Sequence, residues 1–320
     1  MTDVAVIGAG AWGTALAIQA ARAGRAVTLW ARDPARAAAL AATRANPRLP
    51  GHALPAAVTI TAELPTAPLL LLVVPMQHLR AVAARLPPGG PLVACCKGLE
   101  AGSLRLPLEV LAEACPGRPA AVLTGPNFAH EIAAGLPAAA VVAARDPALR
   151  GAVVAALATP GFRLYGNEDA VGAQVGGAAK NVVAIAAGAV MGAGLGENAR
   201  AALITRGLAE LARLAAALGG QAETVSGLSG LGDLVLTCTG ATSRNYSLGV
   251  ALGQGRPLAE ILAGRTTVAE GVATAPALVA RATALGVELP LCTVVAAVVQ
   301  GRLTLAQAVD ALQARRLRDE

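Results

Sequence analysis

Aromatic residues are scarce in this 320-residue sequence, where phenylalanine, tyrosine and tryptophan together make up 2%. A protein that binds nucleic acid needs rings for base stacking and a concentrated basic surface. The net charge is +6, but the arginines are scattered, with one short cluster in "ARRLRDE" near the C-terminus. We therefore expect no nucleic-acid partner. An anionic small molecule fits this charge better, and a surface excess of arginine without any partner stays open.

Metal-ligand spacings and membrane-spanning runs are also missing. The five cysteines and three histidines show neither C-x-x-C nor H-x-x-x-H spacing, so we expect reduced thiols and no metal site. The longest apolar runs, "APLLLLVVP" from Ala67 and "VVAIAAGAVMGAGLG" from Val182, are shorter than the roughly 20 residues of a transmembrane helix. We interpret them as a buried strand and a core helix. No basic stretch precedes the first apolar run, which predicts a cytoplasmic protein without a signal peptide.

Lysine is nearly absent as well. Of the 26 basic residues, all but Lys97 and Lys180 are arginine. Arginine suits surfaces and bidentate contacts, whereas lysine is a compact cation that can lose its proton when it is desolvated. The two lysines of this chain are therefore candidates for sites where arginine would not function.

The first half of the sequence alternates short apolar runs with alanine-rich helical segments. The runs "VAVIGAG", "AVTLW" and "PLLLLVVP" precede predicted helices at about 13–23, 34–42 and 77–86, and "PLVACC", "AAVLTGP" and "AAAVVAA" continue the series. This alternation predicts parallel strands with crossover helices. From about Glu168, long helical segments with glycine loops replace it. We therefore predict an α/β N-terminal Rossmann-type doubly wound sheet over residues 1–172 and an all-α C-terminal domain over residues 173–320.

A glycine-rich turn follows the first predicted strand. Gly8, Gly10 and Gly13 form G-x-G-x-x-G between that strand and a helix, the arrangement that binds a dinucleotide pyrophosphate at a helix N-terminus. At the end of the second strand, Arg32 stands where NAD-specific proteins usually offer a carboxylate, and a guanidinium there suits a 2'-phosphate. NADP is therefore favoured over NAD. Asp33 keeps NAD possible, or caps the helix that follows.

Two further loops of the first domain follow strands in the same way. Lys97 comes directly after "VACC", and "GPNFAHE" with Gly125 and Asn127 comes after the next run. Ligands of open α/β sheets bind beyond the carboxyl ends of the strands. We therefore expect these residues to line the cofactor crevice.

The second domain contributes an anion site and a buried lysine. Ser243 is placed as the N-cap of a helix, with Arg244 and Asn245 in its first turn, which suits a phosphate group, although an ordinary capped helix has the same pattern. Lys180 lies among glycines and alanines, where a nearby carboxylate would poise it to exchange a proton with a substrate oxygen. Asp233, in "GLGDLVLTCTG", either caps the following segment or pairs with a buried lysine.

Together these motifs resemble the NAD(P)-dependent glycerol-3-phosphate dehydrogenases of the prokaryotic type, which interconvert dihydroxyacetone phosphate and sn-glycerol 3-phosphate. The resemblance runs through "GAGAWGTALA", "KGLE", "GPNFAHE", "GGAAKNVVAIAAG", "ARAALITRGLAE", "GLGDLVLTCT", "SRN" and "VAEG", essentially the whole chain. It implies NADP(H) as cofactor, with NAD(H) also accepted, a homodimer, and a role in supplying a phospholipid precursor.

The resemblance also assigns roles to individual residues. Lys180 would act as general acid toward the ketone and as base in the reverse direction. The substrate would contact Lys97, Gly125, Asn127, Lys180, Asp233, Ser243, Arg244 and Asn245. Beside the glycine loop, the cofactor would meet Ala11, Trp12, Arg32, Lys97, Ala129 and Arg244, with Val268 and Glu270 closing over it.

Two departures and two rival functions accompany this resemblance. Ala11 stands where the family commonly has serine, and Asn127 replaces a serine or threonine. A β-hydroxyacid or ketopantoate-type dehydrogenase shares the two-domain plan, but such enzymes bind carboxylates, and "SRN" at a helix start favours a phosphate ester. A non-catalytic NADP-binding regulator would have no need of both lysines, Asp233 and the "SRN" turn.

Overall fold

A computed structural model describes residues 3–264 and 269–314 of the chain. The chain forms two compact units, one of Met1–Lys97 with Leu106–Ala173 and one of Gly98–Arg105 with Gln174–Glu320. The short segment Gly98–Arg105 thus groups with the second unit, although the sequence pattern left it in the first. The predicted α/β sheet and the helical domain after it are both present, so the predicted fold class is confirmed.

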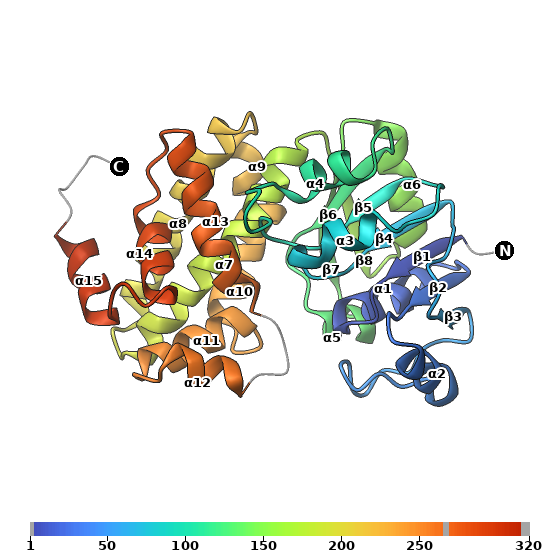
Figure 1. The fold of residues 1–320 in the computed structure, drawn as a ribbon, viewed down its shortest axis with the longest axis horizontal. Coiled ribbons are helices and arrows are strands. Elements are labelled where there is room, and N and C mark those ends of the chain that lie inside the picture. Colours follow the sequence, from blue (N-terminus) through green and yellow to red (C-terminus); the bar gives the residue numbers. More distant parts are fainter. Residues whose placement is uncertain (1–2, 265–268, 315–320) are drawn as a thin grey trace. The chain divides into compact units, whose positions relative to one another are not determined.

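The first unit is built on an eight-stranded sheet of order β3-β2-β1-β4-β5-β6-β7-β8 (Figure 1). Its strands are β1 (Val4–Ile7), β2 (Val27–Trp30), β3 (Val58–Thr61), β4 (Leu69–Leu72), β5 (Leu92–Ala94), β6 (Ala120–Thr124), β7 (Ala138–Ala143) and β8 (Phe162–Asn167). All neighbours are parallel except β6 and β7. The strand order reverses between β1 and β4, the place where sheets of this kind bind ligands.

The helices of this unit connect the strands. They are α1 (Ala11–Arg22), α2 (Pro34–Thr43), η1 (Met76–His78), α3 (Leu79–Ala83), α4 (Pro107–Ala114), α5 (Ala129–Ala134) and α6 (Pro147–Leu157). Alternate residues of each central strand enter different cores. Val4 and Val6 of β1 pack with Leu16 of α1, whereas Ala5 and Ile7 pack with the core that α3 and α4 cover. Burial on both faces explains why β1 reads as a continuous apolar run.

Three features of the sheet differ from the sequence prediction. Strands β3 ("VTIT") and β8 ("FRLYGN") were not predicted, because neither is an apolar run and only their first residues, Val58 and Phe162, are buried. The prediction of purely parallel strands is wrong for β7, which pairs antiparallel with β6. The connection between them runs over residues 125–137 and contains α5, which has six residues.

The second unit has helices and no strand among its described residues. Its elements are α7 (Ala170–Gly192), α8 (Glu197–Ala217), α9 (Ala222–Ser226), the π-helical turn η2 (Leu228–Gly232), α10 (Asp233–Thr239), α11 (Arg244–Gly253), α12 (Leu258–Ala263), α13 (Glu270–Ala284), α14 (Pro290–Val299) and α15 (Leu305–Gln313). The first turn of α7 belongs to the first unit. Pro276 lies inside α13.

Helix α7 is the core of this unit. It has 23 residues, more than the apolar run suggested, and by length and composition alone it could cross a membrane. In the structure 83% of its apolar window is buried inside the protein. The prediction that this run is a core helix is therefore confirmed.

Glycines let α7 and α11 cross at backbone distance. Gly188 and Gly192 of α7 face the backbone of Tyr246 and Val250, and Gly249 of α11 faces the backbone of Ile185. None of these glycines has space for a Cβ atom. The crossing brings the start of α11, the "SRN" segment, close to the helix that carries Lys180.

Candidate active site

The glycine loop has the geometry of a nucleotide-binding turn. Gly8 has φ +125°, which side chains rarely allow, and a Cβ there would collide with the Val73 carbonyl. A Cβ on Gly13 would collide with the backbone of Gly8. A Cβ on Gly10 would instead meet nothing within 4 Å. Gly8 and Gly13 therefore serve the packing of the protein itself, whereas Gly10 leaves open space in front of α1.

The N-terminus of α1 is prepared for an anion. Gly10 is its N-cap, no side chain caps its N–H groups, and its first turn holds no acidic residue. Ala11 and Trp12 are its first two residues, and Trp12 is half-buried against the core. These N–H groups and the helix dipole suit the pyrophosphate of a dinucleotide, so the residues present fit the cofactor that the motif predicts.

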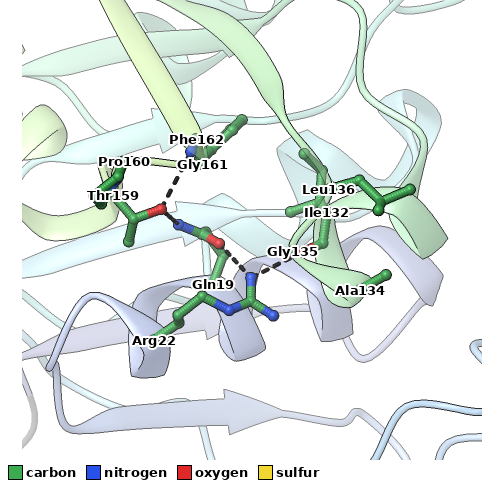
Figure 2. Close-up of a pocket in the computed structure, with 10 residues that line it drawn as sticks. All are labelled: Gln19, Arg22, Ile132, Ala134, Gly135, Leu136, Thr159, Pro160, Gly161 and Phe162. Carbon is green, nitrogen blue, oxygen red and sulfur yellow. Dashed lines mark hydrogen bonds between the residues drawn. The ribbon is translucent and has the colours of Figure 1, made fainter.

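A cavity of about 400 Å³ opens at the other end of α1 (Figure 2). Arg22 there donates to the carbonyl oxygens of Ile132 and Ala133, at 2.9 and 2.6 Å. Gln19 donates to Leu157 O and Thr159 Oγ1, at 2.8 and 3.1 Å. These side chains thus join α1 to α5, to the end of α6 and to the turn before β8. The cavity lies a helix length, about 18 Å, from the glycine loop, and we do not assign it to the cofactor.

The end of β2 carries the two residues that bear on cofactor choice. Asp33 caps α2, because its Oδ1 accepts the Ala35 N–H at 3.0 Å. The alternative that Asp33 is a helix cap is thereby confirmed. Arg32 is exposed, and it makes no hydrogen bond within residues 3–264 and 269–314.

Lys97 and the "GPNFAHE" loop meet at the carboxyl ends of β5 and β6. Lys97 Nζ donates to the Gly125 carbonyl at 3.0 Å. Gly125 has φ +128°, and a Cβ there would lie 3.1 Å from Ala140 Cα of β7. Both amide atoms of Asn127 are buried and lack a hydrogen-bond partner in the described parts of the chain. An unpaired buried amide is costly, so this side chain offers a donor and an acceptor that a polar group could satisfy. Ala129 begins α5 directly after this loop.

Lys180 is held by two groups of α10. Its side chain is 10% exposed, and its Nζ donates to Asp233 Oδ1, which is fully buried. It also donates to Thr237 Oγ1 at 2.9 Å. Thr237 donates its own proton to the Asp233 carbonyl at 2.6 Å, which leaves its oxygen to accept from Lys180. Of the two alternatives that the sequence left open for Asp233, the structure shows the pairing with the buried lysine.

Small residues bring Asp233 to the lysine. Gly176 lies four residues before Lys180 and therefore on the same face of α7. A Cβ on Gly176 would lie 2.6 Å from Ser229 O and 2.8 Å from Gly230 Cα of η2. The π-helical turn thus rests directly on the lysine-bearing face, and Asp233 is the next residue after it. Single π-helical turns often occur at functional sites.

Cys238 lies beside this pair but is not reactive. Burial raises the pKa of its thiol to about 12, against the opposing influence of Lys180. The thiolate, which is the nucleophilic form, is therefore not populated at neutral pH.

The "SRN" segment begins α11 as predicted. Ser243 is its N-cap and accepts the Tyr246 N–H at 3.2 Å, and Arg244 is exposed at the first helical position. Asn245 is buried and makes internal contacts. Its Nδ2 donates to Asn181 Oδ1 at 2.9 Å, and its Oδ1 accepts the Gly271 N–H at 3.0 Å.

These contacts of Asn245 tie together three segments that the sequence singled out. Asn181 follows Lys180 in α7, and Gly271 follows Glu270, the first residue of α13. Asn245 therefore fixes α11 to both helices, a role that the sequence analysis did not foresee. Val268, the other residue expected to close over the cofactor, lies outside the described residues.

Sequence reasoning missed several residues of these clusters. Thr237 was detectable, because it stands one helical turn after Asp233 and so shares its face. Asn181 had only its position beside Lys180 as a signal. Arg36 and Asn46, which contact the glycine loop from α2 and the loop after it, had no local signal at all.

Comparison with known proteins places the chain in a family. Residues 3–150 match the family model for the NAD-dependent glycerol-3-phosphate dehydrogenase N-terminus, and residues 169–310 match that for the C-terminus. A glycerol-3-phosphate dehydrogenase [NAD(P)+] of Acidiphilium cryptum is 64% identical over 255 residues, 79% of each chain. The enzyme of that name from Gluconobacter oxydans is 56% identical over 265 residues, 81% of each chain.

Solved structures give the same grouping. The crystal structure of glycerol-3-phosphate dehydrogenase from Coxiella burnetii has a TM-score of 0.94 and 37% identity, covering 98% of this chain and 99% of that one. A probable 2-dehydropantoate 2-reductase of Bacillus subtilis has a TM-score of 0.62 and 16% identity, covering 94% of this chain and all of that one, a likeness of fold alone. The chain therefore belongs to the NAD-dependent glycerol-3-phosphate dehydrogenase family.

Proposed function

We propose that this protein reduces dihydroxyacetone phosphate to sn-glycerol 3-phosphate, reversibly, with NADPH or NADH, and that Lys180 is its general acid. The observation that carries the proposal is the buried Lys180 ammonium, held by Asp233 and Thr237. Its relatives carry the name glycerol-3-phosphate dehydrogenase [NAD(P)+], which supports an oxidoreductase that uses either nicotinamide cofactor.

The glycine loop would hold the cofactor. Gly8, Gly10 and Gly13 set the turn, and the N-terminal N–H groups of α1 at Ala11 and Trp12 would bind the pyrophosphate. When bound, the cofactor supplies the hydride for the carbonyl carbon of the substrate.

Lys180 would supply the proton. As the carbonyl carbon gains hydride, its oxygen gains negative charge, and a positioned ammonium stabilises that charge and then protonates the oxygen. Asp233 and Thr237 fix two of the three N–H directions of the ammonium, and the Asp233 charge favours its protonated form. In the reverse direction the neutral amine would accept the hydroxyl proton of sn-glycerol 3-phosphate.

The remaining predicted residues would bind the substrate. The unpaired buried amide of Asn127 and the Lys97–Gly125 pair offer polar contacts in the first unit. In the second unit the exposed Arg244 beside the capped start of α11 suits the phosphate group. The Asn245 amide donates one hydrogen bond to Asn181 and accepts one from Gly271. A contact with the substrate would use the second N–H of its Nδ2 or the second lone pair of its Oδ1.

The decisive experiment is NADPH oxidation, followed at 340 nm, after dihydroxyacetone phosphate is added to the purified protein. We expect turnover with this ketone and much slower turnover with 2-ketopantoate. Lys180→Met should lower kcat by about 10² to 10⁴, the usual contribution of a general acid, with little change in NADPH affinity. Turnover restricted to the keto acid would overturn the substrate assignment, and an unchanged kcat in Lys180→Met would remove the lysine from the mechanism.

We also propose, on the resemblance alone, a cytoplasmic homodimer that supplies a precursor of phospholipids. Its oligomeric mass is measurable by light scattering during size-exclusion chromatography. A monomeric mass in an active preparation would contradict the dimer.

A further inference from the structure

Arg36 lies directly against the glycine loop. It is the third residue of α2, and its Nη2 donates to the carbonyl of Ala9, the residue between Gly8 and Gly10, at 2.6 Å. The same nitrogen donates to Asn46 Oδ1 at 3.2 Å. Because these two contacts fix one end of the guanidinium, Arg36 is already ordered before any ligand binds.

Asn46 is the centre of this cluster. It is 2% exposed, and its Nδ2 donates to Thr14 Oγ1 of α1 at 2.6 Å and to Ala9 O at 3.2 Å. Its Oδ1 accepts from Arg36 and also from the Arg48 N–H at 3.0 Å. One buried amide therefore anchors the backbone of Arg48 and the side chain of Arg36 to the glycine loop.

This cluster has an excess of positive charge, because Arg36 and Arg48 lie near a single carboxylate, Asp33. Burial lowers the pKa of Arg36, the nearby charge of Arg48 lowers it further, and Asp33 raises it. Asp33 uses one carboxylate oxygen to cap α2. The Nε and Nη1 groups of Arg36 make no hydrogen bond in the parts of the chain that the structure describes. Two neighbouring guanidiniums with donors to spare form a site for a dianionic group.

We propose that Arg36 and Arg48 bind the 2'-phosphate of NADP(H), and that Arg36 links this phosphate to the glycine loop through the Ala9 carbonyl. The proposal rests on the nicotinamide cofactor named under Proposed function, and it adds two residues to the Arg32 assignment from the sequence. Arg32 is an exposed side chain that must be ordered when the phosphate binds, at a cost in entropy. The Arg36 side chain is already held by Ala9 and Asn46, so it loses less entropy when the phosphate binds.

The test measures binding rather than turnover. The dissociation constants of NADPH and NADH are obtained from nicotinamide fluorescence for wild type, Arg36→Ala, Arg48→Ala and Arg32→Ala. NADPH and NADH differ only in the 2'-phosphate, so the ratio Kd(NADH)/Kd(NADPH) isolates contacts to that group. Loss of the Ala9 contact weakens both cofactors alike and leaves the ratio unchanged. Arg145→Ala is the matched control, since Arg145 is an exposed arginine after β7, five strands along the sheet from β2.

We expect the ratio to fall on the order of tenfold or more in Arg36→Ala and in Arg48→Ala, as removal of a charge-assisted hydrogen bond implies. It should stay at the wild-type value in Arg145→Ala. An unchanged ratio in both variants, with a fall only in Arg32→Ala, would overturn the inference and leave NADPH as the preferred cofactor. A wild-type ratio near one would instead refute the NADP preference itself, and this inference with it.

Discussion

Gly176 of α7 lets η2, and with it Asp233, approach the helix that carries Lys180. Replacement by alanine adds a Cβ 2.6 Å from Ser229 O, 2.8 Å from Gly230 Cα and 3.0 Å from Gly230 N. All three are backbone atoms, so no side chain can rotate out of the way. A normal contact is about 3.5 Å, and η2 must therefore retreat from α7 by roughly 1 Å.

The retreat would be transmitted to Asp233. This residue immediately follows η2, and its carboxylate is fully buried against the Lys180 ammonium. A misplacement of about 1 Å typically costs on the order of 10² in rate, so kcat of Gly176→Ala should fall by about that factor. Overpacking costs about 1–3 kcal/mol of stability, and the better helix propensity of alanine returns at most about 1 kcal/mol.

The assay compares kcat for dihydroxyacetone phosphate, the NADPH dissociation constant, and the free energy of unfolding in urea. Gly151→Ala is the control, because Gly151 is also inside a helix, α6, but a Cβ there meets nothing within 4 Å. It should keep kcat and gain up to about 1 kcal/mol. NADPH affinity should persist in both variants. A wild-type kcat in a folded Gly176→Ala protein would refute the reasoning.

Two further predictions concern the helical unit. Thr237→Val removes an acceptor from Lys180 without a change of volume, and it should lower kcat about tenfold or more because the lost hydrogen bond is to a charged group. Thr237→Ser keeps the hydroxyl and should retain most of the activity. If both variants lost the same share of kcat, the hydrogen bond from Lys180 to Thr237 would not be the cause. The Glu210 carboxylate accepts hydrogen bonds from the Leu291 and Cys292 N–H groups at the start of α14, at 2.6 and 3.1 Å. In Glu210→Gln one of these N–H groups would face the NH2 group of the glutamine and lose its acceptor. We therefore expect the free energy of unfolding to fall by about 1–3 kcal/mol. Burial raises the pKa of Glu210 above its ordinary 4.5 despite those hydrogen bonds, so the folded state holds its proton more tightly than the unfolded state does. The free energy of unfolding of wild type, relative to that of Glu210→Gln, should then fall as the pH rises from 4.5 through the raised pKa. If urea titrations showed this difference rising over that pH interval, the pKa of Glu210 would be lowered in the folded state.

Local patterns in the sequence were sufficient for the parts of the site that a single segment builds. Gly8 and Gly13 show their function through spacing alone, and the structure gives each a steric reason. Ser243 was recognisable as a helix cap from its own segment. Lys180 stood out because the chain otherwise uses arginine, and Asp233 because a carboxylate in a glycine loop needs a partner.

Contacts between distant segments were not predictable in this way. Asn46 reaches Thr14 across 32 positions, and nothing in "RANPRLPG" marks an asparagine that holds the glycine loop. The antiparallel pairing of β7 with β6 was not predictable, because an apolar run such as "AAAVVA" is compatible with either strand direction. Strand β8 was not predicted, because its sequence "FRLYGN" mixes apolar with polar residues and only Phe162 is buried.

The buried pair of Lys180 and Asp233 is better explained by chemistry than by stability. Removing two charges from water costs several kcal/mol per ion, and apolar replacements of similar volume are often as stable or more so. Helix α7 is otherwise an apolar helix that packs through glycine and alanine, and leucine or methionine at position 180 would suit such a core. The fold instead brings η2 against Gly176, buries Asp233 completely and adds Thr237 as a second acceptor. Packing does not require an ammonium that is held in a fixed direction, whereas the proton transfer that we propose for Lys180 does.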